Sequence, residues 1–186
     1  MATAVLRTVY GAELLERFAY YGSVFLIPNF MTVGLGASQS SANIAINCVF
    51  ALSPLSALVA FFPADGRVGK GRVMVVGLML YTTGLLLLTV AALPAVDPSP
   101  GHPKPMAWVF LAAGIAFLSV GYGFFKTVSA PIVADALDHG MVPALDRSKA
   151  FMLYSWIVNV GALAGTLISP FVRGLSDDSA PDPEDD

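Results

Sequence analysis

The feature that most constrains this chain is a series of five long apolar runs. They cover residues 10–35, 43–62, 73–93, 106–134 and 150–171. A helix rises about 1.5 Å per residue, so roughly 20 apolar residues cross the ~30 Å hydrocarbon core of a bilayer. The runs are continuous, whereas strands of a membrane barrel alternate polar and apolar residues over about ten positions. The sequence therefore predicts an all-α fold, a polytopic membrane bundle of five transmembrane helices.

The composition excludes several classes of protein. Only 12% of the residues are charged, whereas a soluble domain carries about 25%. The net charge of −3 offers no basic surface for nucleic acid. Cys48, His102 and His139 match no metal-ligand spacing and have no partnered nucleophile. We therefore expect an integral membrane protein surrounded by the lipid bilayer, with no nucleic-acid partner, no metal, no other cofactor and no enzymatic activity.

The chain is expected to form one helical domain and a short tail. Segments rich in Pro, Gly or charge separate the apolar runs, and we assign 1–175 to the helical domain. Residues 176–186 are acidic, contain Pro and lack aromatic side chains. This composition is typical of solvated segments without a packed core, so we predict a disordered acidic tail.

The distribution of basic residues predicts the orientation, because Lys and Arg favour cytoplasmic loops. With the N-terminus inside, the outer segments hold only Lys104 and Arg173. The inner segments then hold Arg7, Arg67, Lys70, Arg72, Arg147 and Lys149. We predict a multi-pass protein with a cytoplasmic N-terminus, in either the plasma membrane or an endomembrane.

Charged residues also lie inside the predicted spans: Glu13, Glu16, Arg17 and Lys126. A charge at mid-depth costs at least ~2.5–3.5 kcal/mol, so such residues are usually paired and functional. Tyr20 and Tyr21 continue the helical spacing of Glu13, Glu16 and Arg17 along one face. Two simpler interpretations stay open. Glu13 and Arg17 can pair at a helix end that lies in water, and Lys126 can extend to the inner headgroups.

Proton coupling requires, at the least, a pair of acidic side chains that can exchange a Lys or Arg partner for a proton. Protonation of one glutamate removes its negative charge and releases the Lys or Arg paired with it. This change can shift the equilibrium of a structural element that has two conformations. This chemistry fits a carrier driven by protons as the coupling ion, and it does not name a substrate.

Residues 13–22 read E-L-L-E-R-F-A-Y-Y-G. This string resembles the first-helix signature E-x-x-E-R-F-x-Y-Y-G of the proton-coupled oligopeptide transporter family, a branch of the major facilitator superfamily. Further segments resemble the family in the same order. Residues 64–72 are similar to the loop motif A-D-x-x-x-G-R, 121–129 to the fourth-helix G-x-G-G-x-K-P-x-V-S, and 159–161 to the fifth-helix I-N-x-G. Thr127 stands where the fourth-helix motif has Pro.

The resemblance implies proton-coupled transport of di- and tripeptides, with roles for particular residues. Glu13, Glu16, Arg17 and Lys126 would take part in proton coupling. Tyr20, Tyr21, Lys126 and Asn159 would contact the substrate. Asp65, Gly69, Lys70 and Arg72 would belong to a cytoplasmic gating loop, although simple retention of a basic loop inside explains these residues as well. Members of the family have two six-helix halves, so the partner of these five helices would be the missing C-terminal half, and we expect no transport by this chain alone.

Two other functions remain open at this point. A nitrate or other small-anion carrier of the same family would share the first-helix signature. A truncated membrane protein that acts through helix association, without transport, is compatible with five helices and the acidic tail.

The predicted topology can be tested by cysteine labelling. We expect cysteines introduced at Gly71 and Gly101 to react from opposite sides of the membrane, because one span separates them. Labelling of both positions from the same side would contradict the topology.

Overall fold

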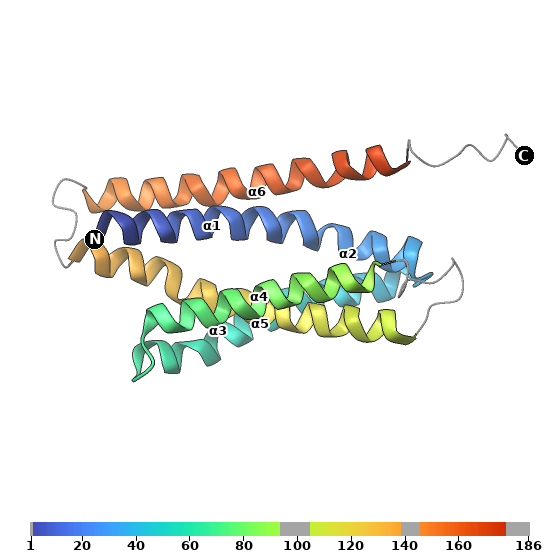
Figure 1. Cartoon of the computed structure of the whole chain (residues 1–186), viewed down its shortest axis with the longest axis horizontal. Coiled ribbons are helices and arrows are strands. Elements are labelled where there is room, and N and C mark those ends of the chain that lie inside the picture. The colour runs from blue at the N-terminus through green and yellow to red at the C-terminus, as the bar shows by residue number, and fades with distance from the viewer. Residues whose placement is uncertain (1, 94–104, 139–145, 178–186) are drawn as a thin grey trace, which may run out of the picture.

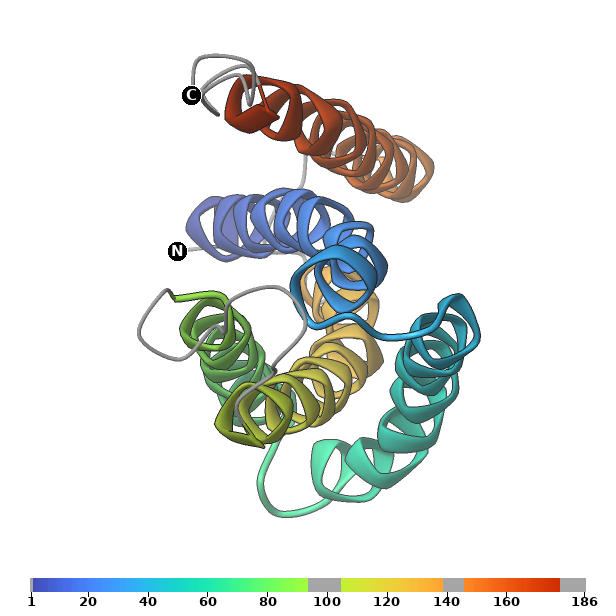
Figure 2. The same cartoon turned by 90° about the vertical axis from the view of Figure 1, so that its right-hand side faces the viewer.

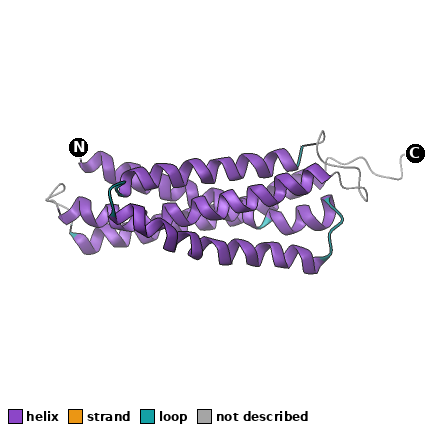
Figure 3. Cartoon of the chain, turned by 90° about the horizontal axis from the view of Figure 1, so that it is seen from below, coloured by secondary structure: helices purple, strands orange, loops and turns teal. Residues whose placement is uncertain are grey.

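The computed structural model describes residues 2–93, 105–138 and 146–177, and it is helical throughout these ranges apart from short connections (Figures 1 and 3). The elements are α1 (Ala2–Val24), α2 (Leu26–Asn29), the π-helix η1 (Phe30–Gly34), α3 (Gln39–Asp65), α4 (Lys70–Ala91), α5 (Pro105–Asp138) and α6 (Arg147–Asp177). The predicted all-α fold is confirmed.

Within the described ranges, four helices are long and apolar enough to cross a membrane: α3, α4, α5 and α6 over Arg147–Phe171. The first predicted run is helical too, but α1 starts at Ala2 rather than near residue 10. Its charged residues Arg7, Glu13, Glu16 and Arg17 set it apart from the other four.

The helix ends differ from the predicted ones for local reasons. Helix α3 starts at Gln39 because Ser38 caps it, its hydroxyl accepting the Ser41 N–H at 3.2 Å. At the other end of the chain, α6 continues to Asp177. The first two residues assigned to the acidic tail are therefore helical, which corrects that boundary. The remaining tail positions 178–186, together with Lys104, His102 and His139, lie outside the described residues.

The helical segment between the start of α1 and the start of α3 is interrupted. Proline has no N–H to donate to the carbonyl four residues earlier, so Pro28 leaves Val24 without that helical partner. The α-helix is interrupted at Phe25, and α2 and the π-helical η1 continue it to Gly34. Proline and π-helical turns are common causes of such a change in helix direction.

The bundle consists of two sets of helices. Helix α5 packs extensively against α4 and α3, while α1 packs mainly against α6 (Figure 2). The start of α1 and the α3–α4 connection lie at one end of the bundle, and the turn from η1 to α3 lies at the other (Figure 1). This alternation of ends is what consecutive membrane spans require.

Close helix contacts depend on glycine. A Cβ added to Gly77 of α4 would lie 2.7 Å from the backbone nitrogen of Phe125 in α5. On the other side of the bundle, a Cβ at Gly161 of α6 would lie 2.6 Å from the carbonyl oxygen of Leu14 in α1. Small residues let helix backbones approach closely, which drives association in lipid, where the hydrophobic effect between helices is absent.

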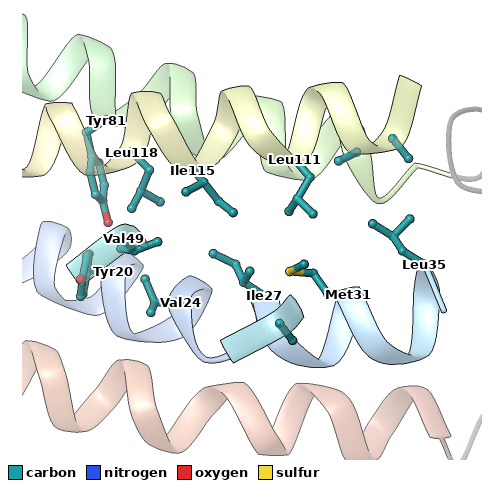
Figure 4. Close-up of a cluster of buried hydrophobic side chains, with 13 residues drawn as sticks. Tyr20, Val24, Ile27, Met31, Leu35, Val49, Tyr81, Leu111, Ile115 and Leu118 are labelled. Atoms are coloured by element: carbon teal, nitrogen blue, oxygen red, sulfur yellow. The ribbon is translucent and has the colours of Figure 1, made fainter. Parts of the chain in front are cut away.

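One apolar core runs along the inner face of α1, α2 and η1. Tyr20, Val24, Ile27, Met31 and Leu35 follow one another at helical spacing and face α4 and α5 (Figure 4). A second core begins at Leu6 and Val9, at the opposite end of α1. The charged residues at 13, 16 and 17 lie between these two cores, so apolar packing closes the site from both ends.

The glycine contact between α4 and α5 gives a stability prediction. We expect Gly77→Ala to lower the free energy of unfolding by about 1–3 kcal/mol, because an added methyl group must displace backbone. Gly71→Ala in the same helix is the matched control, since nothing lies within 4 Å of a Cβ there. Unfolding in mixed detergent micelles, followed by helical circular dichroism, measures both. Equal stability of the two variants would contradict this packing.

Candidate functional site

One face of α1 carries buried acidic and basic side chains, and these form the centre of the site. The exposed fractions of Glu13, Glu16 and Arg17 are 0%, 3% and 5%. Ionised groups are almost never this buried unless they are paired. The interpretation of Glu13 and Arg17 as a surface pair in water therefore does not fit the structure.

Each charge in this face has an opposite charge nearby. The Arg17 guanidinium donates to both oxygens of Glu16, with Nε–Oε2 at 2.8 Å and Nη2–Oε1 at 3.0 Å. Lys126 of α5 forms an ion pair with Oε1 of Glu13, and its Nζ lies 3.7 Å from Oε2 of Glu16. Arg17 Nε is also 3.9 Å from Oε1 of Glu13. Two carboxylates and two bases thus neutralise one another, and Lys126 faces the bundle interior rather than the headgroups.

Aromatic rings enclose the Arg17 guanidinium. Its central carbon lies 4.7 Å from the ring centre of Tyr122, 5.2 Å from that of Tyr20 and 5.7 Å from that of Tyr21. The rings of Tyr20 and Tyr122 stack at 4.6 Å. Aromatic faces attract cations, and the attraction grows when water is excluded. Arg17 is therefore held by Glu16 on one side and by tyrosines on the other.

Sequence reasoning missed one residue of this cluster, Tyr154 of α6. Its hydroxyl donates to Oε2 of Glu13 at 2.9 Å and lies 2.8 Å from the hydroxyl of Ser129 in α5. A signal was present in the sequence. Tyr154 lies seven and eleven residues before Gly161 and Gly165, which is the spacing of one helix face and marks the side that packs on α1.

A pocket of about 470 Å³ opens beside the charged cluster, between α1, α3 and α5. Lys126 is 22% exposed there, while the side chains of Glu13 and Glu16 are closed off. The pocket is lined by Tyr20, Tyr21, Phe50, Ser53, Pro54, Ala57, Tyr122, Gly123 and Lys126. Three of the four predicted substrate contacts are thus in one cavity wall.

A larger pocket, of about 570 Å³, lies between α2, η1 and α4. Its lining is mainly apolar and contains no charged residue. We place the site in the smaller pocket, because only that one combines an apolar wall with a charged group that fixes a ligand's orientation.

The fourth predicted substrate residue, Asn159, is not part of this wall. It is exposed on α6, and its side-chain amide donates to the carbonyl of Ser155 at 2.9 Å. Ser155 and Thr166 share this exposed polar side of α6. The structure therefore brings together Tyr20, Tyr21 and Lys126 but leaves Asn159 apart from them.

The predicted gating residues lie at the end of the bundle where α3 and α4 connect. Asp65 ends α3, and Gly69 precedes α4 with a φ of +83°, a conformation that glycine adopts without strain. Lys70 Nζ contacts Asp135 of α5 at 2.6 Å, while Arg72 is exposed. The loop is thus tied to the same helix that carries Lys126.

Comparison with known proteins is consistent with this geometry. The sequence profile of the POT family matches residues 71–176, which is more than half of the 186 residues. The chain belongs to the POT family.

Named members and solved structures extend the match to most of the chain. Solute carrier family 15 member 1 of Rattus norvegicus is 25% identical over 166 residues, covering 87% of this chain and 23% of the relative. Dipeptide and tripeptide permease A of Serratia proteamaculans is 28% identical, covering 88% of this chain and 29% of the permease. The chain therefore spans about a quarter of the length of these POT relatives.

The fold agrees with POT structures. A bacterial homologue of the human drug peptide transporters PepT1 and PepT2 superposes with a TM-score of 0.77 and 27% identity, over 97% of this chain and 36% of that protein. The tetrameric protein PepTSo2 gives a TM-score of 0.76 at 28% identity, over 96% of this chain and 34% of that protein.

The charge balance of this POT cluster gives a second stability prediction. Lys126→Met leaves the buried carboxylates with one base, and we expect a loss of about 3 kcal/mol in the free energy of unfolding. The double variant Glu13→Gln/Lys126→Met restores neutrality and should lose less. Lys149→Met makes the same change at an exposed lysine and should stay within about 0.5 kcal/mol of the parent. Equal effects at Lys126 and Lys149 would contradict the buried pairing.

Proposed function

We propose that this chain forms the N-terminal helical bundle of a carrier that couples proton entry to the transport of di- and tripeptides. One observation supports this proposal most strongly. Lys126 contacts buried Glu13 and at the same time lines an open pocket. A single base is thereby shared between a titratable carboxyl group and the space that a ligand would occupy.

The coupling follows from competition for Lys126. The carboxylate of a peptide that enters the pocket attracts the Lys126 ammonium group away from Glu13. The buried Glu13 then has only Arg17 nearby, at 3.9 Å, and that guanidinium is already paired with both oxygens of Glu16. Binding a proton to Glu13 therefore becomes more favourable. Conversely, a proton on Glu13 or Glu16 frees Lys126 for the substrate. Each event promotes the other, which is what thermodynamic coupling of two ligands requires.

The pocket suits a small amphipathic ligand. Its volume of about 470 Å³ falls within the range of roughly 300–1,000 Å³ that holds small molecules. Phe50 supplies an apolar wall, Tyr20 and Tyr21 supply rings that carry hydroxyl groups, and Lys126 supplies one positive charge. A peptide offers a matching carboxylate and side chains of varied polarity.

The remaining assignments extend the proposal. The partner of this bundle is a C-terminal half of the same carrier, supported by the exposed polar side of α6 at Ser155, Asn159 and Thr166. In that arrangement Asn159 faces the substrate from across the interface. Asp65, Gly69, Lys70 and Arg72 act as a cytoplasmic gate through the Lys70–Asp135 contact. The protein acts in a membrane with its N-terminus in the cytoplasm.

This function needs proton transfer and exchange of ion pairs, without bond-making chemistry. We therefore assign no enzymatic activity and no cofactor apart from protons. Among the described residues, no group of three or more His, Cys, Asp or Glu side chains is placed to hold a metal ion.

Transport can be tested in a chimera. Residues 1–177 of this chain replace the matching segment of the Serratia permease, and dipeptide uptake by proteoliposomes is driven by an inward proton gradient. We expect uptake by the chimera and none by this chain alone. Glu16→Gln should abolish proton-driven uptake while sparing exchange of substrate, and Lys126→Ala should weaken both.

Lys149→Ala is the control, because that lysine is exposed and lies outside the site. Full proton-driven uptake by the Glu16→Gln chimera would overturn the coupling assignment. Uptake of nitrate without dipeptide uptake would favour the small-anion carrier instead.

A further inference from the structure

Tyr154 links three helices at one buried carboxylate. It belongs to α6, its hydroxyl donates to Oε2 of Glu13 in α1 at 2.9 Å, and the same hydroxyl lies 2.8 Å from the Ser129 hydroxyl in α5. The other oxygen of Glu13, Oε1, forms the ion pair with Lys126. Glu13 is therefore held at both oxygens, by Lys126 at one and by Tyr154 at the other.

The direction of these hydrogen bonds follows from the number of hydrogens. A tyrosine hydroxyl has one hydrogen, and Tyr154 uses it toward Glu13. Tyr154 must then accept from Ser129, whose hydroxyl is the only donor of that pair. Ser129 and Glu13 are both 0% exposed, so bulk water does not compete for these contacts. The result is a directed chain from Ser129 through Tyr154 to Glu13.

Packing alone does not require this hydroxyl. The ring of Tyr154 fills space next to Tyr10, with ring centres 6.3 Å apart, and phenylalanine would fill the same space. Tyr10 provides the contrast, because its own hydroxyl donates to the backbone carbonyl of Ala150 at 3.1 Å instead of to a carboxylate. Of these two tyrosine hydroxyls, the one that donates to Glu13 belongs to Tyr154.

We propose that Tyr154, supported by Ser129, is a positioning residue that fixes the Glu13 carboxyl group when Lys126 moves away. The contact keeps the protonated or released glutamate at one place instead of letting it rotate within the cluster. It also transmits the state of Glu13 to α6, which touches α5 only slightly elsewhere. The role in coupling rests on the proposed transport function, whereas the geometry does not.

The test is infrared difference spectroscopy of the full chain in lipid, at low pH minus high pH. Glu13→Gln identifies the carboxyl C=O band of Glu13 by its disappearance. When the proton is on Oε1, the oxygen that Lys126 leaves, Oε2 is the carbonyl oxygen that accepts from Tyr154. A carbonyl oxygen that loses its hydrogen-bond donor vibrates at higher wavenumber. We expect Tyr154→Phe to shift the Glu13 band to higher wavenumber, and Ser129→Ala to shift it by less in the same direction.

Tyr10→Phe is the matched control and should leave the band where it is. Circular dichroism checks that each variant remains helical, and Ser129→Ala keeps the test informative if Tyr154→Phe does not fold. An unchanged Glu13 band in both Tyr154→Phe and Ser129→Ala, or an equal shift in Tyr10→Phe, would overturn the proposal. The measurement needs no transport, so a failure here is distinct from a failure of dipeptide uptake in the chimera.

Discussion

Neutralisation of the buried charges on α1 is the interaction on which the rest of the structure depends. An unpaired charge at this depth is strongly unfavourable, so α1 can lie inside a membrane bundle only if other helices supply counter-charges. Lys126 of α5 provides the second base, and the Arg17–Glu16 pair balances the rest. The ion pairs of the site are therefore also required for α1 to pack inside the bundle.

The two bases have different surroundings, and this difference separates their roles. Arg17 is fixed by two hydrogen bonds to Glu16 and by the rings of Tyr20 and Tyr122. Lys126 has a flexible side chain, reaches the pocket and contacts the carboxylates from another helix. A planar guanidinium in a bidentate, stacked site is costly to displace, whereas an ammonium group is a mobile point charge. Lys126 is thus the base that can change partners.

The sequence alone predicted the helices and most residues of the charged cluster, because both depend on local patterns. Apolar run length located the five helices, and helical spacing placed Glu13, Glu16, Arg17 and Tyr20 on one face. The contacts of Tyr154 and the exposed position of Asn159 depend on how α6 is rotated about its axis. That rotation is set by the approach of Gly161 and Gly165 to α1. The spacing of these glycines marks one face of α6, but not which helix that face packs against.

The charged cluster lies at the junction between two sets of helices. Helix α5 packs extensively against α3 and α4, and α1 packs with α6, but contact between the two sets is sparse (Figure 2). Between the two apolar cores, the contacts across this junction are polar or aromatic: Lys126 to Glu13, Tyr81 to the backbone oxygen of Glu16 at 3.2 Å, and Tyr122 against Tyr20. Polar contacts respond to protonation in a way that glycine-mediated packing does not. A proton on Glu13 or Glu16 therefore changes contacts at the junction between the two sets of helices, where packing is sparse. The packing within each set does not depend on that proton.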